Sequence, residues 1–416
     1  MKKLFFAFAA ALIALTACKK ENAIKTVTLT VTVDESELTS VKPDTYTVTA
    51  TNSATTVAVS AKTENGIATI PGLVPGIYNL NVAASVSEGP AILNFIGTAQ
   101  SVQVTADASA TVKVAESKTS ALVFKEVYYN GCTIVEPSEE DEYGETYFRD
   151  QFYEIYNNST ETVYADGLCI AVGLWQSYAS YDFSVIYTYD IPNPEKYIFL
   201  KTIWQIPGDG TQYPVKPGES FVVCQWGTNH TAETLAGNKS IDLSGAEFEA
   251  IIAETTLWNG LVITDNAAVN MSRVVETGYA MPQWMASVGD DAVVLFNPSV
   301  ELKNENFISC TNDEYGPDVR EVLRSDILDA VQWRTNKEDG EKAGGLYLPA
   351  EIDGGFQALG ASYTGKSISR KAASTREDGT VVYQDTNNAS VDFQINDKPE
   401  VRRGGAKKPS WNTWAK

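Results

Sequence analysis

Short stretches in which apolar and polar residues alternate are the feature that most constrains this fold. Residues 26–33 alternate threonine with valine or leucine, and residues 45–51 repeat the pattern. Because successive side chains of a strand point to opposite faces of a sheet, a period of two predicts strands with one buried face. Short strands at this spacing predict an all-β sandwich. Looser versions of the pattern occur at residues 56–61, 77–83 and 110–114.

A turn-rich segment at residues 66–78 sharpens this prediction. Gly72, Pro75 and Gly76 are residues that form tight turns, and the apolar residues around them are spaced to point inward. The segment resembles the transthyretin-like, or carboxypeptidase-regulatory, β-sandwich that many surface proteins contain as a spacer. The resemblance covers residues 26–118 and implies a structural or adhesive module rather than a catalytic one.

The composition changes after residue 120. All eight tryptophans follow residue 170, and most tyrosines follow residue 125. Several segments within residues 121–396 resemble, in the same order, those of the lamin-tail domain, which is an immunoglobulin-like β-sandwich. The residues that match its pattern are Glu126, Tyr128, Asn130, Glu154, Tyr156, Asn157, Asp166, Gly167, Ser367, Arg370, Asp385, Asn387, Asn388, Asp392 and Phe393.

Two features depart from the lamin-tail pattern. Leu168 stands where the pattern has a tryptophan-bearing turn, and residues 175–215 have the character of an insertion. Apolar residues at helical spacing predict a short helix at residues 317–326, and the lamin-tail pattern predicts a strand after it. We therefore expect an all-β chain of two β-sandwich domains, with insertions and a few short helices in the second. A basic tail follows at residues 397–416.

The N-terminus has the pattern of an export signal. Two lysines precede an apolar stretch at residues 4–15 that is too short to span a bilayer stably, so residues 1–17 form a predicted signal peptide. The sequence Leu-Thr-Ala-Cys ending at Cys18 resembles the bacterial lipobox, which implies that Cys18 becomes the lipidated N-terminus and that residues 18–25 form a tether. The alternative is a plain secretory signal with a chance cysteine. The resemblance places the chain at the outer membrane of a Gram-negative bacterium, on its periplasmic or its cell-surface face.

The charge and the single histidine exclude several classes of function. The chain has 32 basic and 53 acidic residues, a net charge of −21, which argues against nucleic-acid binding because phosphate contacts need clustered Lys and Arg. One histidine, His230, rules out a multi-histidine metal site. Its polar Thr-Asn-His-Thr context predicts an exposed loop residue. No Ser-hydrolase elbow, phosphate-binding loop or metalloprotease motif occurs, so no catalytic residue is assigned.

The remaining cysteines favour a buried structural role. Cys132, Cys169, Cys224 and Cys310 show no spacing typical of zinc sites. An exported chain can oxidise its thiols, and four cysteines allow three pairings. The strand-like surroundings of Cys169 and Cys224 favour unpaired core residues, with disulfides as the alternative.

Acidic residues raise two further possibilities. Glu139, Glu140, Asp141 and Glu142 form the densest run, which could bind calcium but lacks the spacing of a specific loop, so a solvated acidic loop is the favoured interpretation. No other cofactor is expected. On probable central strands, Glu126 and Glu154 need partners if they are buried, and Arg370 is one candidate. We interpret them as members of a structural network rather than a catalytic acid pair.

Aromatic residues suggest a ligand surface. Sugars bind aromatic faces beside polar groups, and such residues alternate from residue 174 to residue 189. The candidate surface residues are Trp175, Tyr178, Tyr181, Trp204 and Trp226, with a large sandwich core as the alternative.

The favoured function is a non-enzymatic cell-envelope lipoprotein that captures a glycan or other nutrient or serves in adhesion, and an accessory role beside an outer-membrane transporter would fit it. The alternatives are a glycan hydrolase with paired carboxylates and a purely structural spacer. The basic tail, at residues 402–408 above all, could contact acidic partners or lipid headgroups, although a flexible solubilising tail is the favoured interpretation. Trp411 and Trp414 suggest instead that it docks.

Overall fold

The structure is a computed structural model of the 416-residue chain. It describes residues 25–415, apart from residues 39–41, 89–90, 140–141, 143, 175–195, 252–254, 257–259, 276–285, 303–307, 310–317, 339–346 and 350–351. Over these residues the chain is built almost entirely from strands, as predicted. Among them no helix has both the length and the apolar composition that a membrane crossing requires.

The chain divides into two compact units. The first consists of the chain up to Ala84 together with Phe95–Glu116, and the second of Ser85–Asn94 together with Ser117–Lys416. Each unit has its own buried apolar residues. The units are therefore described separately.

The first unit consists of two sheets. In the three-stranded sheet, β1 (Val27–Asp34) lies between β4 (Ile67–Leu73), which is antiparallel to it, and β7 (Ala108–Lys113), which is parallel. Alternate residues of β1 are buried, which is the outcome that its period of two predicts. The five-stranded sheet has the order β3 (Ala58–Lys62), β2 (Thr47–Asn52), β5 (Gly76–Glu88), β6 (Ala91–Val104) and β8 (Ala115–Ser120), of which the last residues of β5 and β8 and the first of β6 are counted in the second unit.

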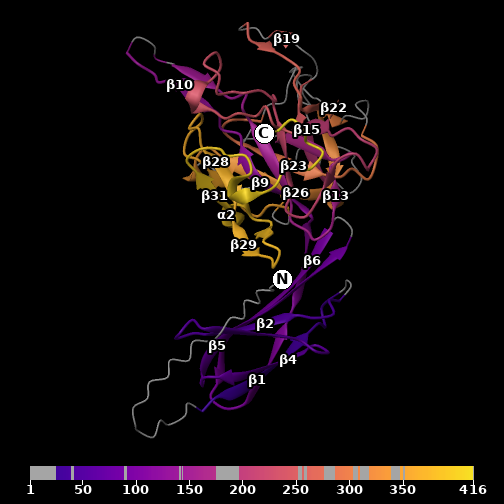
Figure 1. The fold of residues 1–416 in the computed structure, drawn as a ribbon, viewed down its shortest axis with the longest axis vertical. Helices are drawn as coiled ribbons and strands as arrows, with labels where there is room; N and C mark the ends of the chain where they lie inside the picture. Colours follow the sequence, from indigo (N-terminus) through magenta and orange to yellow (C-terminus); the bar gives the residue numbers. More distant parts are fainter. Residues whose placement is uncertain are drawn as a thin grey trace, which may run out of the picture. The chain divides into compact units, whose positions relative to one another are not determined.

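The second unit is a sandwich of two larger sheets (Figure 1). One has the order β21 (Val269–Asn270), β18 (Phe248–Glu249), β17 (Ser220–Cys224), β12 (Phe152–Asn157), β9 (Leu122–Tyr128), β28 (Ser367–Arg370) and β31 (Phe393–Asn396). The other has the order β24 (Ile308–Ser309), β25 (Asp318–Leu323), β15 (Tyr197–Gln205), β14 (Cys169–Leu174), β23 (Asp291–Phe296), β26 (Ile327–Arg334) and β27 (Gln357–Ala358), with β22 (Ser272–Val275) also paired to β15.

Smaller elements complete the second unit. The two-stranded sheets are β10 (Cys132–Val135) with β11 (Glu145–Tyr147), β13 (Val163–Tyr164) with β16 (Pro214–Val215), β19 (Thr255–Thr256) with β20 (Val262–Ile263), and β29 (Ala372–Thr375) with β30 (Val381–Tyr383). The short helices are η3 (Gly237–Lys239), η4 (Arg324–Asp326), α2 (Ala389–Asp392) and η5 (Arg403–Gly405).

The main core lies between the two large sheets. It contains Phe124 and Phe221 from the seven-stranded sheet and Leu295 and Trp333 from the other. The ring of Trp333 stacks on that of Tyr129, with centroids 4.1 Å apart and an interplanar angle of 15°. This stacked pair joins the sheets directly, because Tyr129 follows β9 and Trp333 lies on β26.

The helix predicted at residues 317–326 is wrong. Residues 318–323 form strand β25, which pairs with β15, and only the three residues of η4 are helical. The apolar spacing matched a helix, but hydrogen bonding to a neighbouring strand decided the conformation. The strand predicted after this segment is confirmed as β26.

Loss of the stacked tryptophan should destabilise the second unit strongly. Trp333→Ala removes a fully buried ring, so we expect the free energy of unfolding to fall by about 3–5 kcal/mol. Urea denaturation followed by circular dichroism measures this. Tyr164→Ala is the control, because Tyr164 is 44% exposed, and its unfolding curve should stay within about 0.5 kcal/mol of the unsubstituted chain. Equal effects of the two changes would contradict the assignment of this core.

Candidate functional site

A cavity of about 420 Å³ lies on the outer face of the seven-stranded sheet. On β17, Phe221 and Val223 point into the core between the sheets, so Val222 between them points to the opposite face. Val222 packs there with Leu243 and Ala246, which precede β18. The volume falls within the range of pockets that hold small molecules, roughly 300–1,000 Å³.

The cavity combines apolar walls with a few polar groups. Asp242 and Ser244 are exposed at its rim, and the Asp242 carboxylate accepts a hydrogen bond from the Ser244 backbone N–H at 2.9 Å. Arg402 and the half-buried ring of Trp414 line it from the C-terminal segment. An aromatic ring beside a hydroxyl, a carboxylate and a guanidinium is suited to a ligand with an apolar face and polar edges. The other lining residues are Val222, Leu243, Gly245, Ala246, Val401 and Ala415.

The C-terminal segment is a fixed wall of this cavity. The indole N–H of Trp411 donates to Pro214 O at 2.9 Å, and its ring packs 5.0 Å from that of Tyr213. Likewise, the Trp414 indole donates to Ala246 O at 2.9 Å. The prediction of a flexible tail is therefore wrong, while the docking suggested by its two tryptophans is confirmed. Burial of the two apolar rings stabilises the docked segment more than solvation of the neighbouring lysines and arginines favours a free one.

Close packing at Gly245 leaves no room for a side chain. A Cβ atom there would lie 3.0 Å from the Cβ of Ala415. The Asn412 amide donates to Gly245 O at 3.0 Å and also contacts Glu247. The side chains of Asn412 and Ala415 thus pack closely against Gly245 at one side of the cavity.

Arginines of the C-terminal segment neutralise carboxylates buried on the same face of the sheet. Arg402 pairs with Glu247 at 2.6 Å, and its backbone N–H donates to Glu154 at 2.9 Å. Arg403 pairs with Glu126 at 2.9 Å. Burial raises the pKa of Glu126 and Glu247, and the paired arginines oppose that rise.

Glu154 also has a partner on its own sheet. The Lys125 ammonium lies 3.1 Å from its carboxylate, and the Ser220 hydroxyl donates to it at 2.6 Å. These internal pairs fit the interpretation of Glu126 and Glu154 as structural residues. However, Arg370 is not their partner, so that part of the prediction is wrong.

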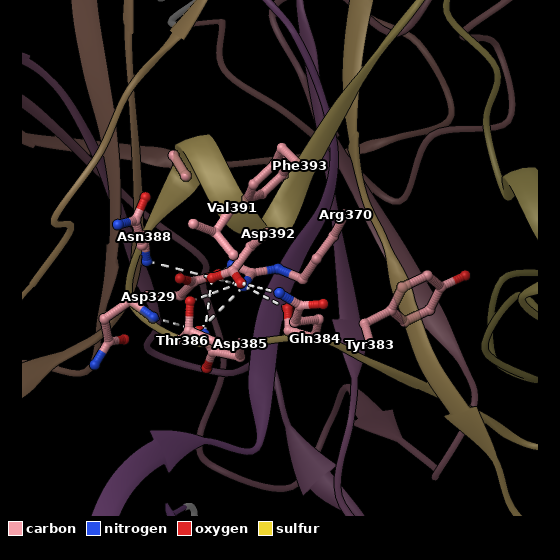
Figure 2. A network of polar contacts seen from close by, with 12 residues as sticks. Asp329, Arg370, Tyr383, Gln384, Asp385, Thr386, Asn388, Val391, Asp392 and Phe393 are labelled. Atoms are coloured by element: carbon pink, nitrogen blue, oxygen red, sulfur yellow. Dashed lines mark hydrogen bonds and ion pairs between the residues drawn. The ribbon is translucent and has the colours of Figure 1, made fainter. Parts of the chain in front are cut away.

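Arg370 is the centre of a separate buried network (Figure 2). Its guanidinium contacts three carboxylates, those of Asp329 at 2.5 Å, Asp385 at 3.1 Å and Asp392 at 3.6 Å. It also donates to Phe124 O at 2.8 Å and stacks 4.7 Å from the centroid of Phe393. These partners belong to both large sheets and to the segment around α2, so one side chain connects three parts of the unit.

The charge of Arg370 is fixed by its surroundings. Although burial alone would lower it, the three carboxylates hold the pKa of Arg370 above its ordinary value. Burial raises the pKa of Asp329 to about 7, and Arg370 opposes the rise. A guanidinium with this many partners forms a planar clamp that lysine does not reproduce.

Removal of the Arg370 charge should lower the free energy of unfolding more than removal of an exposed charge. Arg370→Met leaves three carboxylates buried without their cation, so we expect a loss of about 3–5 kcal/mol in the free energy of unfolding. Urea denaturation measures it. Lys337→Met, at an exposed lysine, should change stability by less than about 0.5 kcal/mol. A loss for Arg370→Met as small as for the control would contradict the role of the network.

His230 is fully buried, so the prediction of an exposed loop residue is wrong. Its Nε2 lies 3.0 Å from Trp226 O and its Nδ1 lies 2.7 Å from the Tyr147 hydroxyl. Because a carbonyl only accepts, Nε2 carries the proton and Nδ1 accepts from Tyr147. Burial lowers the pKa of His230 to about 4, which makes it neutral near pH 7. The polar local sequence could not reveal the two aromatic neighbours that cover it, Trp226 and Tyr147.

The lowered pKa has a direct consequence. Unfolded chain takes up this proton near pH 6.5, whereas folded chain does so only near pH 4. The stabilising contribution of His230 is therefore complete above pH 6.5 and is lost as the pH falls towards 4.

Nuclear magnetic resonance can test this because the chain has one histidine. We expect the imidazole Cε1–H signal of the folded chain to titrate with a midpoint near pH 4. The urea-unfolded chain is the matched control and should titrate near its usual pH of about 6.5. Coincident midpoints would show that His230 is solvated.

Two of the five aromatic residues predicted at a ligand surface are interior residues. Trp204 is 1% and Trp226 4% exposed, so their prediction as surface residues is wrong. Each packs in a core cluster, the interior alternative that the sequence left open. Trp175, Tyr178 and Tyr181 lie outside the described residues.

The structure describes three of the four internal cysteines, part of the predicted calcium site, and not the predicted lipidation site. Glu139 and Glu142 are exposed, while Glu140 and Asp141 are not among the described residues, and the calcium site stays a prediction. Cys18 likewise lies outside the described residues. Cys132, Cys169 and Cys224 are buried free thiols, as favoured, and Cys310 is not described.

The sequence did not predict a cavity lined by Asp242, Ser244, Arg402 and Trp414. Trp414 had a detectable signal, because two tryptophans in a basic terminal segment indicate docking. The other three are common polar residues. Only the packing of distant segments brings them together.

Comparisons with known proteins relate this chain to a family. Residues 216–400 match the model of the family described as "Protein of unknown function (DUF4876)". A crystal structure of a DUF4876 family protein from Bacteroides thetaiotaomicron superposes with a TM-score of 0.62 at 29% identity, over 93% of this chain and 99% of that one. A candidate adhesin from Bacteroides ovatus gives a TM-score of 0.22 at 9% identity, over 83% and 98% of the two chains. No curated protein matches the sequence.

Proposed function

We propose that this chain is an exported, lipid-anchored binding protein, and that the cavity beside Trp414 receives a small ligand with an apolar face and polar edges, such as a sugar residue. The combination of an aromatic ring, a hydroxyl, a carboxylate and a guanidinium around about 420 Å³ is the observation that supports this proposal. The lipobox-like sequence at Cys18 supports export and anchoring.

A binding role agrees better with this cavity than a hydrolytic one. Glycoside hydrolases mostly use two carboxyl groups about 5–9.5 Å apart. Asp242 is the one carboxylate in the lining of this cavity. The carboxylate of Glu247 nearby is paired with Arg402 and accepts a hydrogen bond from Asn412. Glu126 and Glu154, the acidic residues that the sequence singles out, have internal partners as well.

The rim groups are free to contact a ligand without unfolding the turn that holds them. Asp242 is exposed, and one of its oxygens organises the turn through the Ser244 N–H. An asparagine side chain can keep that acceptor while losing the charge. The ligand contacts and the local structure can thus be separated by substitution.

A glycan array and isothermal titration calorimetry on residues 19–416 test the proposal. We expect a glycan that binds the unsubstituted chain to bind Asp242→Asn at least about tenfold more weakly, because a charged hydrogen bond is lost. Trp414→Ala should abolish binding, although it also removes a contact of the C-terminal segment. Unchanged affinity in Asp242→Asn and Trp414→Ala would place the ligand elsewhere.

Tyr164→Ala is the matched control, because Tyr164 is an exposed aromatic residue that does not line the cavity. Its affinity should equal that of the unsubstituted chain. Thermal melting of each variant separates lost contacts from lost folding. Absence of any glycan binding, and of any thermal stabilisation by small polar ligands, would favour the structural-spacer alternative.

A further inference from the structure

One end of the first unit exposes large apolar side chains. Val57 is 60%, Val74 50% and Ile77 46% exposed. Val57 follows β2, and Val74 and Ile77 flank the turn between β4 and β5. Monomeric soluble domains expose single apolar residues routinely, but a group of them marks a contact surface.

Backbone hydrogen bonds place these three residues in neighbouring loops. The Asn52 N–H donates to Val57 O and the Ser53 N–H donates to Ile77 O, both at 2.9 Å. The Tyr78 hydroxyl donates to Val74 O at 2.7 Å. The three exposed side chains therefore belong to one end of the unit, which we call the apolar end.

The chain enters the unit at this same end. Val27, the first residue of β1, pairs with Leu73, which directly precedes Val74. Val27 stands nine positions after Cys18 in the sequence. Fully extended, these nine steps span at most about 30 Å. Wherever Cys18 is held, the apolar end is the part of this unit nearest to it along the chain.

Charge is distributed unevenly between the two ends. Residues 52–57 and 72–77 contain no charged residue, while Lys25, two residues before β1, and Asp107, just before β7, are charged groups beside the start of β1. The opposite end holds Asp34, which is the last residue of β1, and Glu64, which lies in the turn beside it. The loop after β1 adds Glu35, Glu37 and Lys42. Two loops without charge, on a chain with a net charge of −21, can approach a lipid surface at a low desolvation cost.

We propose that the apolar end rests on the lipid bilayer, with Val57, Val74 and Ile77 inserted at the interface between headgroups and acyl chains. This inference rests on the lipid anchor proposed at Cys18, which would hold this end within reach of the membrane. Apolar side chains that enter the interface add to membrane binding in proportion to the area they bury, and they hold the unit in one orientation that an anchor on a tether alone does not set. The contact fixes the orientation of the first unit, with β1 running away from the membrane.

Vesicles with an artificial tether test the contact. Residues 19–416 with an N-terminal hexahistidine tag are bound to phosphatidylcholine vesicles that contain a nickel-chelating lipid. A bimane fluorophore is attached at Val74→Cys or, as the matched control, at Glu64→Cys at the opposite end. The native cysteines Cys132, Cys169 and Cys224 are buried, and the labelled unsubstituted chain measures any background from them and from Cys310.

We expect brominated lipids to quench the label at position 74 at least twofold more than the label at position 64, with a shift of its emission to shorter wavelength. Equal quenching at the two positions would overturn the proposal. A shift that occurs without vesicles, as the protein concentration rises, would also overturn it and would identify a second copy of the chain as the occupant.

Sedimentation of the untethered chain with vesicles gives a second measurement. Val57→Ser/Val74→Ser/Ile77→Ser should lower the vesicle partition coefficient by about tenfold or more. Ile67→Ser/Ile96→Ser is the control, since Ile67 and Ile96 are exposed away from the apolar end, and it should partition like the unsubstituted chain. Equal losses in the two variants would overturn the proposal. Mass spectrometry of the mature N-terminal peptide tests the anchor at Cys18 separately, because the tethered vesicles do not depend on it.

Discussion

The second unit depends on the neutralisation of carboxylates that its seven-stranded sheet buries. Glu126, Glu154 and Glu247 lie on the outer face of that sheet, and Asp329 lies where Arg370 connects the two sheets. A buried carboxylate without a partner is costly, so each must meet a cation or several hydrogen-bond donors. The cations come from segments far away in the sequence. The folded topology is consequently the one that brings Arg370, Arg402 and Arg403 to these positions.

This requirement also explains why a basic segment at the end of the chain is ordered. Arg402 and Arg403 provide charge, and Trp411 and Trp414 provide apolar area. Neither contribution alone accounts for the docking, since ion pairs with buried carboxylates also carry a desolvation cost and isolated tryptophans need a complementary surface. Together they cover one face of the sheet and leave the cavity between Trp414 and the turn at Asp242. A candidate ligand site therefore arises from a structural need for neutralisation.

How much the sequence predicted depended on the range of the interaction. The strands of the first unit that alternate apolar and polar residues, such as β1, follow from a pattern within a few residues, and the strand after the segment at residues 317–326 was predicted. The helix at residues 317–326 failed because apolar spacing alone cannot report a neighbouring strand. His230 failed for a similar reason: Tyr147 is 83 residues away, and its ring replaces the solvent that a polar loop suggests.

The sequence by itself determined the all-β class, the alternating strands of the first unit, and the need of Glu126 and Glu154 for partners. Those properties depend on local periodicity and composition, which are written along the chain. Tertiary structure alone decided that Arg370 pairs with Asp329, Asp385 and Asp392 rather than with Glu126 or Glu154, and that Trp204 and Trp226 are interior residues. Choosing among equally charged or equally aromatic candidates requires knowing which surfaces meet, and that follows only from the packing of sheets formed by distant segments.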